Sequence, residues 1–175
     1  LHHPIEMQNY IFDQVMEAGA EFDIKPFGIR AMDSMRLEKS YRLIPREMSI
    51  EYSAFESGLD RFVRLDKEED FIGKTALSQW QDRGPTNGFV TMEVLGIIDA
   101  DARGSEAIYK DGEVIGRGTS GGYGWRCGKS LALGLVRLDL AAIGTEIEIE
   151  VLGEKYKAIV IEESPFDPTN ECLRS

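Results

Sequence analysis

The feature that most constrains the fold of this chain is a change of sequence period at Gly88. From there on, β-branched and other apolar residues alternate with polar ones, which is typical of strands with one buried face. We predict six strands, at residues 89–97, 106–110, 113–117, 131–138, 146–152 and 156–163. No helical pattern separates them. The sequence therefore favours a small antiparallel barrel or sandwich, and we expect a six-stranded antiparallel barrel.

Glycine marks the expected turns of this half. Asp111-Gly112 lies between two strand candidates, and an Asp-Gly pair readily adopts the positive φ angles of a two-residue hairpin turn. Gly153-Glu154 is expected to join the last two strands in the same way. The glycine-rich segment 116–128 is interpreted as a long barrel turn or as a flat surface for a ligand, because glycine occurs where backbones approach closely.

Residues 1–85 have a different hydrophobic pattern, which predicts helices joined by connectors. In residues 4–18 the apolar side chains recur at three- and four-residue steps and Gly19 follows, as in an amphipathic helix with a glycine stop. Further helices are predicted at 26–39 and 73–82. Gly84-Pro85 is the best candidate boundary, so we expect one domain at residues 1–85 and another at residues 86–175.

Composition excludes several classes of partner and chemistry. The 31 acidic residues outnumber the 20 basic ones, giving a net charge of −11 that would repel nucleic acid or an anionic membrane. No apolar run approaches the roughly 20 residues that a membrane span needs. The only histidines are His2 and His3, which argues against His-dependent triads and an internal His-rich metal site.

Cysteine and acidic residues suggest no metal or redox site. Cys127 and Cys172 stand 45 positions apart, too far for a CxxC motif, and are expected as two thiols or as one disulfide. The acidic groups at 68–70, 99–101 and 162–163 lack the ligand spacing of a calcium loop and are interpreted as solvated faces. No metal ligand is assigned.

Two glycine motifs resemble nucleotide-binding fingerprints without their context. Residues 116–121 match GxGxxG, but a strand is predicted to follow where a helix should begin. Residues 128–130 resemble the end of a phosphate-binding loop, but Tyr123 stands where its leading glycine should be. Neither motif is interpreted as a nucleotide site.

The segment 33–38, Asp-Ser-Met-Arg-Leu-Glu, places two acids and an arginine at helical spacing. Asp33 and Arg36 are i and i+3 neighbours, close enough to pair. Taken alone, Arg36 and Glu38 are interpreted as parts of a structural ion-pair arrangement.

This segment also carries a resemblance. Residues 27–41 resemble the DSLRLE helix of the aminomethyltransferase family, the glycine cleavage T-protein and its relatives. Further similarities follow in collinear order at 56–59, 70–77, 118–123 and 128–133. Residues 30–34, 39–41 and 163–168, with Leu173-Arg174, are most similar to the branch in which a folate-binding module follows a flavin-dependent dimethylglycine or sarcosine dehydrogenase.

The resemblance implies an α+β protein: a truncated α/β folate-binding domain followed by the β-barrel. It implies a tetrahydrofolate site that receives the carbon unit released from a methylated amine, with FAD only in a missing upstream domain of the same chain. The protein would be cytoplasmic, or in the mitochondrial matrix of a eukaryote. We expect no nucleic-acid or membrane partner.

The family's catalytic aspartate and its pterin-binding glutamate would precede the opening helix, so no catalytic residue is assigned and the isolated fragment is expected to be inactive. Two cofactor-binding residues are carried over. Tyr41 matches a folate-lining tyrosine, and Met32 stands where T-proteins place a folate-contacting arginine. A methionine could pack against a flat pterin, or it could belong to the helix core.

Two alternatives to the dehydrogenase-linked function stay open. One is a stand-alone aminomethyltransferase or a folate-dependent demethylase of an amine or sulfonium compound, without a flavin domain. The other is a non-catalytic member that binds folate as a regulator or serves as a scaffold.

Overall fold

A computed structural model describes residues 1–174 of the chain. The chain divides into two compact units, one from Leu1 to Met32 and the other from Asp33 onward. Helix α2, Ile29–Glu38, begins in the first unit and ends in the second.

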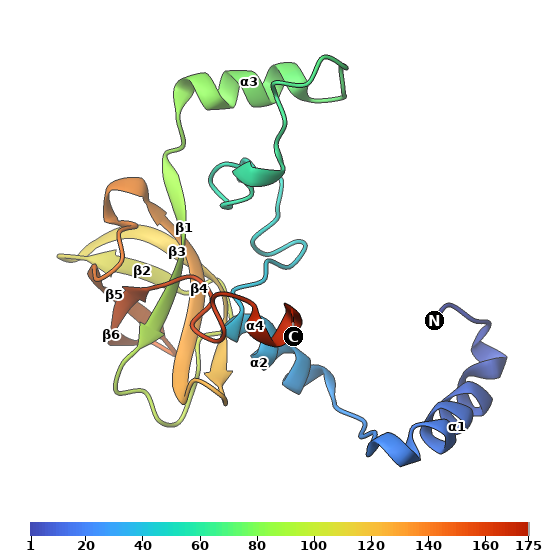
Figure 1. The fold of residues 1–175 in the computed structure, drawn as a ribbon. Coiled ribbons are helices and arrows are strands. Elements are labelled where there is room, and N and C mark those ends of the chain that lie inside the picture. Colours follow the sequence, from blue (N-terminus) through green and yellow to red (C-terminus); the bar gives the residue numbers. More distant parts are fainter. Residues whose placement is uncertain (175) are drawn as a thin grey trace. The chain divides into compact units, whose positions relative to one another are not determined.

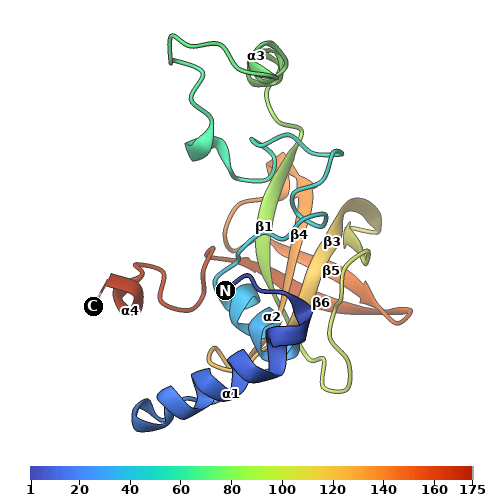
Figure 2. The ribbon, with the colours of Figure 1, turned by 90° about the vertical axis from the view of Figure 1, so that its right-hand side faces the viewer.

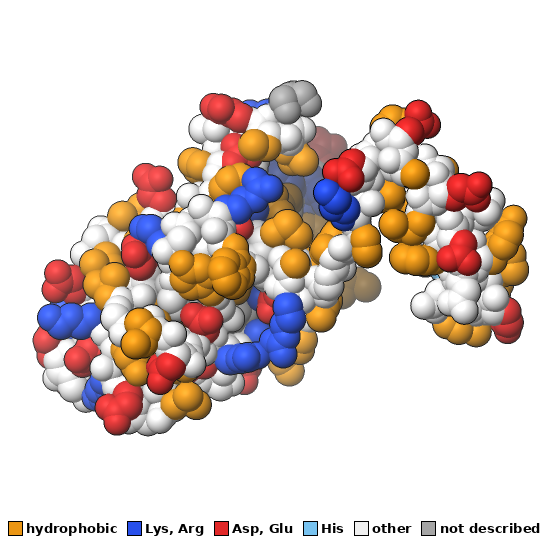
Figure 3. All heavy atoms as spheres, turned by 90° about the horizontal axis from the view of Figure 1, so that it is seen from below, with side chains coloured by type: hydrophobic (Ala, Val, Ile, Leu, Met, Phe, Trp, Pro, Cys, Tyr) orange, Lys and Arg blue, Asp and Glu red, His pale blue; other side chains and the backbone are white. Residues whose placement is uncertain are grey.

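The first unit contains short helical elements. A 3-10 turn at Ile5–Met7 leads into α1, Gln8–Ala18, and a second 3-10 turn follows at Ala20–Phe22. The helix predicted at 4–18 is therefore confirmed, although its first turn is 3-10. None of the residues of α1 is buried, and Figure 3 shows hydrophobic side chains exposed over this unit.

The second unit is built on a closed antiparallel barrel (Figure 1). Its strands are β1 (Asn87–Val94), β2 (Ala107–Lys110), β3 (Glu113–Gly124), β4 (Lys129–Arg137), β5 (Glu146–Val151) and β6 (Glu154–Ile161). Around the barrel they are ordered β1-β4-β3-β2-β5-β6, and β6 closes onto β1. The predicted α+β class and six-stranded barrel are confirmed.

The barrel core follows from the alternation seen in the sequence. Along β5, Ile147, Ile149 and Val151 are buried, whereas the glutamates between them face outward. Ile149 lies beside Ile108 of β2 in the strand register. The other buried apolar residues of this core include Val90, Met92, Val94, Ala132, Val136, Ala158 and Val160.

The other helices of this unit flank the barrel or stand apart from it. Helix α3, Lys74–Arg83, confirms the helix predicted at 73–82, has no buried residue, and lies away from the barrel in two perpendicular views (Figures 1 and 2). Two 3-10 turns occupy Asp60–Phe62 and Leu138–Leu140, and α4 spans Glu171–Arg174. Among the described residues, no helix has the length and apolar character needed to cross a membrane.

The two predicted hairpin turns have different outcomes. Asp111 and Gly112 both have positive φ, 52° and 83°, as predicted for the β2–β3 turn. The β5–β6 turn is formed by Leu152-Gly153, with φ of 52° and 87°, and not by Gly153-Glu154. Val151 pairs with Glu154 across this turn, so Glu154 already belongs to β6.

The interpretation of segment 116–128 as a long turn was wrong, because β3 continues to Gly124 and only residues 125–128 turn. Its glycines permit close contacts between backbones. A Cβ on Gly116 would lie 2.2 Å from the carbonyl oxygen of Leu135, and one on Gly121 would lie 2.4 Å from that of Ala102. No helix follows the GxGxxG match, which agrees with its rejection as a nucleotide site.

Candidate functional site

The C-terminal half of α2 lies against the β3–β4 side of the barrel. The hydroxyl of Ser34 donates a hydrogen bond to the carbonyl oxygen of Tyr123, at 2.7 Å. Leu37 is fully buried and forms an apolar cluster with Leu131 and Leu133 of β4. The segment recognised in the sequence, residues 33–38, is thus fixed to the barrel by both polar and apolar contacts.

Arg36 connects this helix to the residue expected to line a ligand site, Tyr41. Its Nε donates to Oδ1 of Asp33 at 2.9 Å, and its Nη1 donates to the carbonyl oxygen of Tyr41 at 2.9 Å. The amide of Tyr41 in turn donates to the carbonyl oxygen of Arg36, at 3.1 Å. The predicted Asp33–Arg36 pair therefore exists, and it holds the backbone on which Tyr41 is presented.

Tyr41 and Met32, the two cofactor-binding residues predicted from the sequence, both have accessible side chains. Tyr41 is 52% exposed and Met32 is 48% exposed. Met32 ends the first compact unit, whereas Tyr41 lies in the second, so each is located only within its own unit. The exposure of Met32 argues against a place in a packed core, and the role of both residues stays a prediction.

Glu38 is buried and supports the turn between β3 and β4. Its Oε1 accepts hydrogen bonds from the amides of Arg126 and Cys127, at 2.5 and 3.1 Å. Burial raises the pKa of the Cys127 thiol, and the neighbouring Glu38 carboxylate raises it further. The thiol is thus kept in its protonated form, which makes Cys127 a poor nucleophile. No disulfide joins it to Cys172.

Glu47 is a fully buried carboxylate that sequence reasoning missed. Its Oε1 accepts hydrogen bonds from the hydroxyls of Thr119 and Ser120 in β3, each at 2.6 Å. Its Oε2 accepts from the amide of Leu43 at 2.8 Å and lies 3.6 Å from Nη1 of Arg36. Glu47 therefore joins the arginine that holds Tyr41 to the wall of the barrel.

Glu56 is a second buried carboxylate and begins segment 56–59, one of those that carry the family resemblance. It accepts hydrogen bonds from Ser53 and, across 30 or more residues, from Thr86 and Asn87. Burial by itself would raise the pKa of Glu56, but these hydrogen bonds to its carboxylate outweigh burial and lower it. The group is held as an anion that ties the connector to the start of β1.

One of these carboxylates carried a signal in the sequence. Ser53 and Glu56 have the Ser-x-x-Glu spacing of a capping box, and their reciprocal hydrogen bonds are present: the Glu56 amide donates to the Ser53 hydroxyl at 3.2 Å. Glu47 had no such signal, because the sequence around a connector glutamate does not show whether its side chain is buried or solvated.

The chemistry available in this region is binding and positioning. Glu47 and Glu56 use both carboxylate oxygens within the protein, and Glu38 uses its Oε1. The described part of the chain contains no cluster of three or more His, Cys, Asp or Glu side chains that could hold a metal ion. The region thus offers an exposed aromatic residue on a rigid support, and its buried carboxylates are already engaged within the protein.

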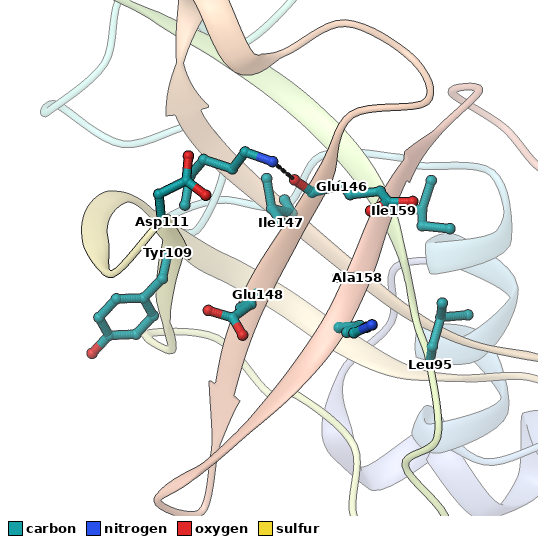
Figure 4. A pocket seen from close by; sticks show the side chains of 10 residues that line it. Leu95, Tyr109, Asp111, Glu146, Ile147, Glu148, Ala158 and Ile159 are labelled. Carbon is teal, nitrogen blue, oxygen red and sulfur yellow. Dashed lines mark hydrogen bonds between the residues drawn. The ribbon is translucent and has the colours of Figure 1, made fainter.

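A separate cavity of about 400 Å³ opens on the barrel wall beside β2, β5 and β6 (Figure 4). Its lining mixes charges and apolar groups, including Tyr109, Glu148, Lys157 and Ile159. Lys110, also in the lining, donates to the carbonyl oxygen of Glu146 at 2.8 Å, drawn as a dashed line. Neither Met32 nor Tyr41 lines this cavity.

Two family models match the chain. The GCVT N-terminal domain matches residues 1–67, and the glycine cleavage T-protein C-terminal barrel domain matches residues 88–167. The second match covers the observed barrel from β1 to β6.

The similar proteins include two kinds of enzyme. The mitochondrial dimethylglycine dehydrogenase of Homo sapiens is 40% identical over 99% of this chain, which spans 20% of that protein. An aminomethyltransferase of Bacillus cytotoxicus is 35% identical over 89% of the chain, and 42% of that protein is covered. The chain thus spans between a fifth and about two fifths of these relatives.

A solved structure has the same fold. The glycine cleavage system aminomethyltransferase T from Bartonella henselae superposes with a TM-score of 0.82, at 22% identity, over 94% of this chain and 45% of that one. With the two family models and the relatives, this identifies the sequence resemblance as a true relationship. The chain belongs to the aminomethyltransferase, or glycine cleavage T-protein, family.

Proposed function

We propose that this chain forms the C-terminal part of a tetrahydrofolate-dependent one-carbon transfer protein of the dimethylglycine or sarcosine dehydrogenase kind. The 40% identity with a dimethylglycine dehydrogenase over 99% of the chain supports this choice within the family. In the whole protein, FAD in a preceding domain would oxidise a methylated amine, and tetrahydrofolate would accept the released carbon. The division into residues 1–85 and 86–175 is part of the same proposal, supported by family-model matches that end at 67 and resume at 88.

The observation that carries the proposal is the presentation of Tyr41. Arg36 binds the backbone of this residue at both its amide and its carbonyl, so the side chain is about half exposed on a fixed support. A tyrosine offers a ring face to a flat heterocycle and a hydroxyl to a polar edge. Met32, also about half exposed, offers a polarisable thioether to the same kind of ligand.

Tetrahydrofolate fits these residues only in part. Its pterin has adjacent N–H groups that a carboxylate would accept, and the buried glutamates of this region are engaged within the protein. The pterin-binding carboxylate and the acid that handles the proton would therefore come from residues that precede this chain. Tyr41 and Met32 would orient the folate, and tetrahydrofolate itself would supply the nitrogen that takes up the carbon.

Calorimetry of the whole protein with tetrahydrofolate tests this proposal. Tyr41→Ala should weaken binding about tenfold or more, since loss of a stacked ring and a hydrogen bond together corresponds to about 1.4 kcal/mol or more. Tyr41→Phe, which keeps the ring, should lose less. Tyr10→Ala removes another exposed tyrosine as a control. Equal affinity of wild type and Tyr41→Ala would reject the site.

The second candidate is an aminomethyltransferase or demethylase without flavin, which the 35% identity with an aminomethyltransferase favours. The visible absorbance of the purified whole protein separates the two, because only the dehydrogenase would carry flavin. A non-catalytic scaffold would release no heat with millimolar tetrahydrofolate. We further propose a cytoplasmic location, or the mitochondrial matrix in a eukaryote, since the dehydrogenase relatives are mitochondrial.

A further inference from the structure

Three arginines from separate segments line one cavity of about 270 Å³ in the second unit. Arg46 comes from the connector after α2, Arg103 from the loop between β1 and β2, and Arg117 from β3. The rest of the lining is formed by Pro45 and by residues 104–105 and 118–119. Such a concentration of positive charge is unexpected on a chain with a net charge of −11.

The charges in this cavity are only partly compensated. Within the described residues, the guanidinium of Arg103 makes no hydrogen bond or ion pair. Arg46 donates to a neutral acceptor, the carbonyl oxygen of Arg103, at 2.9 Å. Arg117 pairs with Glu51 at 2.5 Å. Two guanidiniums are thus left without a carboxylate.

The nearby carboxylates are engaged elsewhere. Glu106 binds the amides of Arg103 and Gly104, at 2.6 and 2.7 Å, and so fixes the loop that carries Arg103. Glu47 is engaged by Thr119 and Ser120 beneath the cavity. Glu51, the partner of Arg117, has a side chain 56% exposed to solvent, where screening weakens the attraction.

The wall of the cavity is preformed. The amide of Ser105 donates to the carbonyl oxygen of Gly118 at 2.7 Å, and the amide of Gly118 donates to that of Glu106 at 2.8 Å. Gly104 has a φ of 117°, and a Cβ there would lie 2.4 Å from the carbonyl oxygen of Thr119. The loop is therefore held close to β3, so a ligand would need little ordering of the backbone.

We propose that this cavity binds a multivalent oxyanion, of the carboxylate or the phosphate class. Each guanidinium presents a planar set of N–H donors that matches both classes of oxyanion. A bound anion would offset the mutual repulsion of the three arginines and give the exposed guanidinium of Arg103 a charged partner. This inference uses neither Tyr41 nor Met32 and does not depend on the proposed function.

Calorimetry of this chain at low ionic strength, with citrate in one series and pyrophosphate in another, tests the proposal. Binding of either anion is expected, with an affinity that falls as salt is added. Arg103→Gln should weaken it about tenfold, because hydrogen bonds to charged groups are among the stronger ones. Since the Arg103 side chain is exposed and makes no hydrogen bond or ion pair within the described residues, this variant is expected to fold normally, and thermal unfolding checks that it does.

The matched control is Arg64→Gln, which removes the same charge from an exposed pair with Asp66 outside the cavity. Its affinity for the anion should equal that of the wild type. A preference for citrate or for pyrophosphate identifies the class of the natural ligand. Absence of binding to both anions, or equal weakening by Arg103→Gln and Arg64→Gln, would overturn the proposal.

Discussion

Two regions of this molecule are stabilised in different ways: the barrel by apolar packing, and the segment at residues 33–58 mainly by hydrogen bonds to buried carboxylates. Inside the barrel, strands meet through buried apolar side chains such as Met92, Ile108 and Ile149. The segment at 33–58 is fixed mainly by polar side chains, with Glu38, Glu47 and Glu56 buried and hydrogen-bonded to barrel residues or to its edge. Tyr41, the predicted ligand residue, belongs to the second region.

This difference has consequences for function. Apolar burial has no direction, so a barrel tolerates small shifts of its side chains. Hydrogen bonds fix both distance and angle. Those from Arg36 to the carbonyl oxygen of Tyr41 and from the amide of Leu43 to Glu47 do so for the backbone around Tyr41. A rigid presentation of a ligand residue is therefore better supplied by the polar region, with the barrel as its base.

The largest change in the free energy of unfolding is expected for a substitution in the apolar core of the barrel. Ile108→Ala should lower the free energy of unfolding by about 2–5 kcal/mol, because a fully buried side chain is removed and a cavity remains. Urea unfolding followed by circular dichroism measures it. Ile98→Ala, at a position 97% exposed, should change stability by about 0.5 kcal/mol or less. Equal effects at the two positions would contradict the assigned core.

The next effect concerns the carboxylate that joins both regions. Glu47→Gln keeps the shape of the side chain but replaces one acceptor oxygen with an NH₂ donor, which then faces donors from Thr119 and Ser120 or from Leu43. We expect a loss of about 2 kcal/mol, since hydrogen bonds to a charged group are replaced and one donor faces another. The same unfolding measurement applies, with Glu162→Gln as an exposed control. A wild-type stability would show that this carboxylate is not needed as an anion.

The sequence predicted the apolar region better than the polar one. Alternation along 146–151 fixes which residues of β5 face the core, and Asp111-Gly112 has the residue types its turn requires. The shift of the last turn to Leu152-Gly153 was not predictable from composition, since leucine rarely adopts positive φ. Segment 116–124 was misread because glycine has no side chain, so a glycine-rich strand shows no alternation.

In the polar region, only contacts between residues close in the sequence could be predicted. The pairing of Asp33 with Arg36 and the box of Ser53 with Glu56 follow from i, i+3 positions. Contacts such as Glu47 with Ser120 join residues far apart in the chain, and a single sequence gives no information on such pairs. The site prediction, Met32 and Tyr41, came from family resemblance and still awaits the binding test.

A smaller effect, with a pH dependence, is expected at Glu56. Its hydrogen bonds lower its folded-state pKa, so the stabilisation is fully present above the unfolded pKa of about 4.3 and is lost as the pH falls through the folded value. Glu56→Gln should therefore cost about 1–1.5 kcal/mol at pH 7 and progressively less in acid. Chemical unfolding of the wild type and the variant at a series of pH values measures the cost at pH 7 and its decrease in acid. A difference independent of pH would contradict the anionic role of Glu56.

The smallest effect is expected where the polar region meets the barrel through neutral groups. The hydroxyls of Ser40 and Thr91, both buried, share a hydrogen bond of 2.7 Å, and the amide of Ser164 donates to the Ser40 oxygen at 3.2 Å. Ser40→Ala or Thr91→Val should each cost about 1 kcal/mol, because one change leaves the other hydroxyl buried without this partner.

The double variant Ser40→Ala/Thr91→Val completes a thermodynamic cycle that isolates this contact. Its cost should fall short of the sum of the single changes by about 0.5–1 kcal/mol, because both hydroxyls are then removed together. Part of the cost should remain, since the amide of Ser164 loses its acceptor in either case. Strict additivity would mean that the two hydroxyls do not interact in solution. The Ser40 hydroxyl would then contribute nothing at this strand, and of the polar side chains it would be Glu56, through Asn87, that fixes the segment there.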